Sequence, residues 1–140
     1  MSVQMILLPL FVQVLLTLLL GLMLFSARTA ALRGQQVRWQ DIALGEPRWP
    51  PAAIQIGNAF RNQFELPVLF YVLTILVIIT RQADFIFVVL AWIFVLTRVA
   101  HAYVHVTSNH VPTRGMIYGL GAALLLIMWG MFMLRLLLAA

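Results

Sequence analysis

The chain has 140 residues, of which 64% are hydrophobic and 9% charged, and its mean hydropathy is +1.02. Soluble domains are roughly half apolar and a quarter charged, so this composition predicts a single-domain integral membrane protein. The absence of cysteine excludes disulfides, thiolate metal sites and a cysteine nucleophile. All basic residues are arginines scattered beside hydrophobic spans, so the net charge of +5 favours membrane orientation and anion binding over nucleic-acid binding.

The first apolar run, Met5–Ser26, has about the ~20 residues needed to cross a membrane. We expect a retained helix over about residues 5–28. A signal peptide is the alternative, but no positive charge precedes the run, and the run exceeds the 7–15 apolar residues of such peptides. One face of this helix should point inward, because it carries small and polar residues: Gln13, Thr17, Gly21 and Arg28.

A polar connection follows from Arg33 to Pro51, and it contains both charge signs. Two tryptophans in it, Trp39 and Trp49, suit the head-group level of a membrane. Three prolines should stop any helix in this connection, because proline lacks the backbone N–H and clashes with the preceding turn. These are Pro47, Pro50 and Pro51.

The second helix is expected over about residues 52–80, with a bend caused by Pro67 just beyond a polar stripe. The stripe covers roughly 120° of the helix surface and comprises Gln55, Asn58, Arg61, Asn62 and Glu65. Arg61 and Glu65 are spaced as i,i+4 partners. Charged groups inside a membrane are costly and usually face a bundle interior or a ligand. The alternative is that these groups only join helices by hydrogen bonds.

The third helix should span residues 85–106 after a tight turn, and the fourth should span about 113–138. Arg98, His101 and His105 share one face of the third helix. A metal or haem site is an alternative for the histidines. We expect no metal, because both come from one helix and no carboxylate completes a ligand set.

On the fourth helix, Arg114 and Tyr118 are i,i+4 neighbours. Gly115 and Gly119 form a small-xxx-small step that permits close helix packing.

Four spans with short connections predict an all-α membrane protein, a four-transmembrane-helix up-down bundle. The polar ends of all four helices then lie on one side, which predicts a site near one membrane face. The first connection holds four arginines and the second holds only Arg81. By the positive-inside rule the arginine-rich side is cytoplasmic, so both termini should be periplasmic.

Three sequence features resemble one membrane-protein family. Asn62-x-x-Glu65 is followed by Pro67, then come Arg98-Val-Ala-His101 and Pro112-x-Arg114 with Tyr118. Together they resemble the MAPEG family, the membrane-associated proteins of eicosanoid and glutathione metabolism, across roughly residues 57–120. NQFELPVLFY and HVTSN resemble a bacterial branch of that family, which implies the bacterial inner membrane. The resemblance implies a homotrimer that binds glutathione, as co-substrate, near the cytoplasmic face between neighbouring subunits.

The resemblance also implies roles for single residues. Arg61, Asn62 and Glu65 would contact the glutathione backbone. Arg98 would support Glu65 or Asn62, and His101 would lie near the peptide. Arg114 would face the sulfur with Tyr118 beside it, which makes these two the expected catalytic residues. Arg28 is similar to the arginine that closes the first helix in the family, and His105 stands at a position of the binding site.

This chain departs from the family pattern at three positions. Asn58 replaces an arginine found in many members, His105 replaces a tyrosine, and Gly115 replaces a serine. The resemblance implies a glutathione-dependent transferase or peroxidase that activates the thiol for attack on a lipophilic electrophile. The alternative is a non-catalytic trimeric membrane protein that binds a thiol or a lipid.

Overall fold

The computed structural model describes residues 1–45 and 48–139, so the predicted helix stop at Pro47 lies outside the described residues. The described chain contains helices and no strands. The helices are α1 (Val3–Arg33), α2 (Trp39–Ile42), α3 (Pro51–Asn62), α4 (Leu66–Ile79), α5 (Phe85–Val106) and α6 (Val111–Leu138). Four segments are long and apolar enough to span a membrane, with α3 and α4 together forming one of them. The predicted fold class, an all-α four-helix membrane bundle, is confirmed.

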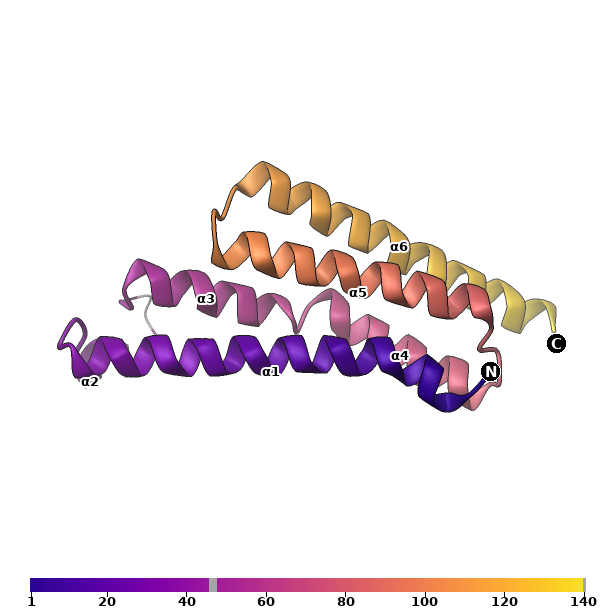
Figure 1. Cartoon of the computed structure of the whole chain (residues 1–140), viewed down its shortest axis with the longest axis horizontal. Helices are drawn as coiled ribbons and strands as arrows, with labels where there is room; N and C mark the ends of the chain where they lie inside the picture. The colour runs from indigo at the N-terminus through magenta and orange to yellow at the C-terminus, as the bar shows by residue number, and fades with distance from the viewer. Residues whose placement is uncertain (46–47, 140) are drawn as a thin grey trace.

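The helices run up and down, and Figure 1 shows the start of α1 and the end of α6 at the same end of the bundle. The opposite end holds the last turns of α1, the start of α3 and the turn between α5 and α6. The predicted polar ends of the four spans therefore lie together. Helix α5 packs against α1, α3 and α6, and this central position makes it the most buried of the four spans.

Helix α1 begins at a serine cap, because the Ser2 hydroxyl accepts a hydrogen bond from the Met5 N–H at 3.4 Å. The helix continues to Arg33, and the N–H of Gly34 caps it by donating to the Ala30 carbonyl at 2.9 Å. Arg28 therefore lies inside α1, which continues to Arg33, beyond the expected end of the first helix near residue 28.

The polar connection contains one short helix, α2, although the sequence predicted none there. Its first residue is Trp39, and the Asp41 carboxylate accepts a hydrogen bond from the Arg38 N–H at 3.1 Å. The connection ends at Pro50, one residue earlier than expected, and Pro51 begins α3 instead of stopping a helix. Proline is favoured at the first helical position because it has no donor to lose there.

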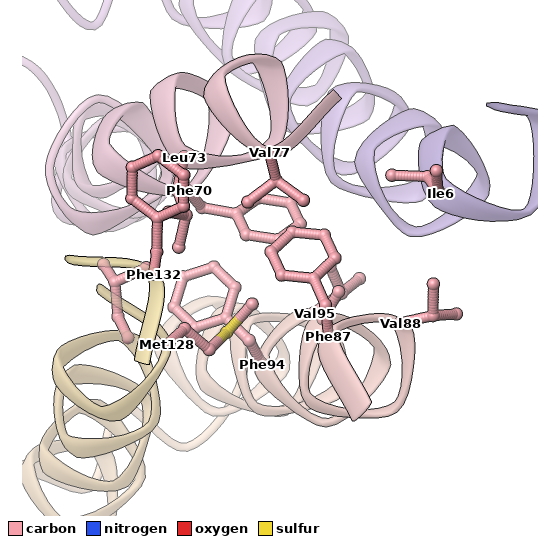
Figure 2. Close-up of a cluster of buried hydrophobic side chains, with 12 residues drawn as sticks. Ile6, Phe70, Leu73, Val77, Phe87, Val88, Phe94, Val95, Met128 and Phe132 are labelled. Atoms are coloured by element: carbon pink, nitrogen blue, oxygen red, sulfur yellow. The ribbon is translucent and has the colours of Figure 1, made fainter. Parts of the chain in front are cut away.

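The apolar core lies between α4, α5 and α6, with Ile6 added from α1, and Figure 2 shows its side chains. Phe70 of α4 faces Phe94 of α5, with 4.9 Å between the ring centroids. Met128 of α6 packs into the same cluster. All three are almost fully buried. This cluster packs the helices together in the half of the bundle that lies away from the polar end.

Glycines set the closest helix approaches, but not the two that the sequence singled out. A Cβ on Gly121 would lie 3.0 Å from the Thr97 hydroxyl, and a Cβ on Gly21 would lie 3.2 Å from Phe60. Gly115 and Gly119 face open space in the subunit, so their predicted close packing does not occur within it. Gly121 instead is the glycine of α6 that packs closely against α5.

Candidate functional site

The polar stripe of the second span is split by a break in the helix. Helix α3 ends at Asn62 and α4 begins at Leu66, so the break lies inside the stripe and not beyond it as predicted. Proline disrupts the turn that precedes it, because it cannot donate to the carbonyl four residues earlier, which here belongs to Gln63. The N–H groups of residues 63, 64 and 65 each bond three residues back, at 3.0–3.2 Å.

The break brings Glu65 against two other helices. One carboxylate oxygen, Oε2, accepts from Asn62 Nδ2 at 2.9 Å and from the Tyr118 hydroxyl of α6 at 3.3 Å. Arg98 of α5 donates to Asn62 Oδ1. Asn62 therefore joins the carboxylate to the guanidinium, and residues from the second, third and fourth spans form one network.

Arg98 is the largest fully buried side chain in the described chain. Its guanidinium carbon lies 5.5 Å from the centroid of the Tyr118 ring, a cation–π distance. Its Nε and Nη1 atoms have no hydrogen-bond partner among the described residues. Buried donors without partners carry a free-energy cost, and in native proteins they often mark a functional site or an ordered water.

The two histidines extend this network along α5. The His101 ring lies 5.7 Å from the Tyr118 ring and 5.5 Å from the His105 ring, both measured between centroids. The Nδ1 atom of each histidine is buried and lacks a partner within the described ranges. Residues 1–45 and 48–139 contain no group of three or more side chains that could hold a metal ion.

Helix α3 is tied to the end of α5 by Gln55. Its side-chain Nε2 donates to the carbonyls of His105 at 2.8 Å and Thr107 at 3.1 Å. The last carbonyls of a helix have no donor within the helix. Gln55 supplies one, and so fixes the end of α5 that carries His105.

The turn between α5 and α6 positions Arg114. Asn109 adopts a left-handed conformation with φ of 51°, which asparagine tolerates better than most residues. Its side-chain oxygen accepts a hydrogen bond from Arg114 Nη1. His110 caps α6 by accepting from the Thr113 N–H at 3.4 Å, and Pro112 lies in the first turn. The cap and the turn fix the start of the helix that presents Arg114.

These side chains surround a pocket of about 240 Å³. It is lined by Asn62 of α3, by His101 and His105 of α5, and by Arg114 and Tyr118 of α6. Gly115 also lines the pocket and offers no hydroxyl there. The pocket combines side chains that can form hydrogen bonds with one cation, Arg114. This combination suits a ligand that carries both amide groups and a negative charge.

Arg28 and Arg61 lie in a second pocket of about 400 Å³, together with Asn58 and Trp49. The Arg28 guanidinium carbon lies 5.0 Å from the centroid of the Trp49 ring. No ion pair joins Arg61 to Glu65 within the described residues, so the predicted i,i+4 pairing is wrong. The helix break between them turns Glu65 toward α6, while Arg61 stays on α3 beside Arg28.

The predicted site residues thus divide into two groups within one subunit. Five of them line the first pocket: Asn62, His101, His105, Arg114 and Tyr118. Glu65 and Arg98 support that pocket through hydrogen bonds, while Arg28 and Arg61 line the second. Sequence reasoning missed the role of Asn109. The position of an asparagine in a short interhelical turn, five residues before an arginine, is the only sequence signal for it.

Comparison with known proteins gives a family match. The MAPEG family model matches residues 6–134, nearly the whole chain. No curated protein and no solved structure matches the chain. The matched range includes most of the first and fourth spans, all of the second and third, and the residues of both pockets and of the Glu65 network. The chain belongs to the MAPEG family.

Proposed function

We propose that this protein is a glutathione-dependent transferase or peroxidase of the bacterial inner membrane. It activates the thiol at the cytoplasmic membrane face for attack on a lipophilic electrophile. One observation carries the proposal: a carboxylate held by Asn62 and Tyr118 lies beside a pocket that Arg114 also lines. Membership of the MAPEG family supports it, since members of that family use glutathione.

The amine and peptide groups of glutathione match the polar groups in and beside the pocket. Its α-amino group is positively charged and suits the Glu65 carboxylate, which Asn62 holds in place. Its peptide groups suit the amide of Asn62 and the ring nitrogens of His101. Binding through these groups leaves the cysteine sulfur free to face Arg114.

Arg114 would favour the thiolate form of the bound cysteine. A free thiol with a pKa near 8.5 is only a few per cent thiolate at pH 7. Lowering the thiol pKa by about two units stabilises the anion by ~2.7 kcal/mol. The thiolate then forms a bond to the electrophilic atom as the leaving group departs. Tyr118 lies beside the reacting sulfur, and the electrophile enters laterally from the bilayer.

The two pockets of one subunit are separate, and we propose that a homotrimer joins them. The second pocket carries Arg28 and Arg61, which suit the carboxylates of glutathione. Assembly would place this pocket against the Arg114 pocket of a neighbour. Light scattering in detergent should give about three times 15.8 kDa for the protein after subtraction of the micelle. A stable monomer would contradict the shared site.

The arginine distribution sets the proposed orientation. The connection between the first and second spans lies near Arg28, Arg33, Arg38 and Arg48. The opposite turn has only Arg81. A reporter inserted near Gly45 should therefore be cytoplasmic, and one fused to the C terminus should be periplasmic. The reverse pattern would put the pocket on the wrong side for cytosolic glutathione.

Isothermal titration of the detergent-purified protein with glutathione and S-hexylglutathione tests the proposal directly. Glu65→Gln should weaken binding of both compounds about tenfold, because the amine contact does not depend on the sulfur charge. Wild-type protein should also show the ultraviolet absorbance of a thiolate when glutathione binds. Absence of binding by either compound would refute the proposal.

The second candidate is a non-catalytic trimeric membrane protein that binds a thiol or a lipid. Gly115 favours it, because the pocket lacks a hydroxyl at a position beside Arg114. Asn58 also leaves the second pocket with fewer positive charges than the family pattern implies. Glutathione binding without a thiolate band would support this candidate over the enzyme.

A further inference from the structure

A pair of buried glutamines connects the first span to the helix break beside Glu65. Gln13 of α1 is 0% exposed and Gln63 in the break is 1% exposed. Gln13 Nε2 donates to Gln63 Oε1 at 2.8 Å. This contact links residues 50 positions apart in the sequence and joins α1 to the break in the second span.

The Gln63 side chain also supplies a hydrogen bond that the backbone loses at the break. In a continuous helix the Gln63 N–H would bond to the Ala59 carbonyl. Here that N–H bonds to Phe60 at 3.0 Å, and the Gln63 side-chain Nε2 donates to the Ala59 carbonyl at 3.1 Å. An unsatisfied backbone carbonyl costs several kcal/mol within a membrane. The side chain of Gln63 therefore replaces the lost backbone bond and fixes how far α3 unwinds.

The contact between Gln13 and Gln63 bears on the site because Gln63 is next to residues of the site. Gln63 lies between Asn62, which contacts both Arg98 and Glu65, and Glu65, which contacts Tyr118. The direction of both side chains depends on the backbone of residues 62–65. Gln13 belongs to neither pocket, yet it holds the residue on which this backbone depends.

We propose that Gln13 and Gln63 are positioning residues, which set the helix break so that Glu65 and Asn62 face the ligand pocket. This inference rests on the proposed function for its effect on glutathione. The hydrogen-bonded pair Gln13–Gln63, here called the clamp, acts on affinity through Glu65 and Asn62 and does not touch the ligand. Loss of the clamp should therefore let the break move and reduce the time that Glu65 spends toward the pocket.

The test uses Gln13→Met and Gln63→Met, which keep the side chains unbranched and similar in volume but remove the hydrogen bonds. Hydrogen–deuterium exchange should be faster at residues 63–65 in both variants, with Gln63→Met the more affected because it also loses the Ala59 contact. Thr74→Val is the matched control. Thr74 is equally buried and bonds only to the Phe70 carbonyl of its own helix, so its loss should leave residues 63–65 unchanged.

Affinity provides the second readout. Gln13→Met should weaken S-hexylglutathione binding about threefold to tenfold, the range expected for one hydrogen bond. Combined with Glu65→Gln, it should have a smaller additional effect than it has alone, because part of the clamp's action runs through Glu65 and the rest through Asn62. A purely structural role predicts additive losses instead.

The outcomes separate the two proposals. Failure of the wild-type protein to bind glutathione or its S-hexyl analogue would refute the proposed function, and hydrogen exchange would still decide whether the clamp exists. Unchanged exchange at residues 63–65 in both glutamine variants would overturn the clamp. Faster exchange with unchanged affinity, or additive losses with Glu65→Gln, would overturn the positioning role.

Discussion

The two ends of the bundle bury charge in different ways. At the end of the bundle where α4 connects to α5, Asp84 caps α5 by accepting a hydrogen bond from the Phe87 N–H at 2.8 Å. Its other oxygen pairs with Arg135 of α6 at 2.6 Å, and both side chains are 39% exposed. At the other end, Arg98 is 0% exposed and two of its nitrogens lack partners in the described chain.

The difference distinguishes groups that serve stability from groups that serve binding. Asp84 and Arg135 have satisfied partners and reach solvent or head groups, so the pair needs no ligand. Arg98 is desolvated and incompletely paired, which is unfavourable for stability alone. Replacing an arginine should therefore mainly affect ligand binding at the Arg98 end and stability at the Arg135 end.

The largest expected effect is at Arg114. Arg114→Ala should reduce kcat for conjugation of a model electrophile about 100-fold, because the charge stabilises the reacting sulfur. It should leave S-hexylglutathione affinity nearly unchanged and abolish the thiolate absorbance. Steady-state kinetics and a parallel titration measure the two effects. An equal loss of affinity for the S-hexyl analogue would show that Arg114 binds the ligand backbone.

Arg98→Met should have the next largest effect. It removes the guanidinium that holds Asn62, so glutathione affinity should fall about 30-fold or more. The thermal unfolding midpoint should stay near that of the wild type, since an apolar side chain of similar length avoids the cost of burying a charge. Arg135→Met is the matched control, with unchanged affinity. A large fall in Tm for Arg98→Met would show that the buried arginine mainly stabilises the fold.

A smaller effect is expected at Asp84. Asp84→Ala removes both a helix cap and an ion pair, so it should lower the free energy of unfolding by about 1–2 kcal/mol. Arg135→Met removes only the ion pair and should cost less than about 1 kcal/mol. Denaturation in detergent compares the two variants. Equal losses would show that the cap contributes nothing.

The smallest effect concerns Asp41, outside the spans. Its hydrogen bonds to the Arg38 guanidinium lower the pKa of the Asp41 carboxyl. A lowered folded pKa contributes stability above the unfolded pKa, and this contribution is lost as the pH falls through the folded pKa. Arg38→Gln should raise the Asp41 pKa toward its ordinary value, as measured by carboxyl carbon NMR. Glutathione affinity should not change, because neither residue lines the Arg114 pocket.

Much of the fold follows from the sequence. Long apolar runs predict four spans. Each forms a helix, because backbone groups inside a bilayer must form hydrogen bonds with one another and a helix satisfies them within one segment. Short connections then force the up-down order, and this order brings the polar ends of the spans together. The spacing of Arg98, His101 and His105 on one face is also a local property, and it survives in α5 as predicted.

The tertiary structure decided where the second span breaks and which of its side chains meet, and residue spacing alone could not. Pro67 predicts a distortion, but its place within residues 63–65 depends on the buried contact between Gln13 and Gln63. That break separated Arg61 from Glu65, although their spacing alone would pair them. Helix periodicity describes one straight helix, whereas packing against α1 and α6 determines where a helix yields and which side chains then meet.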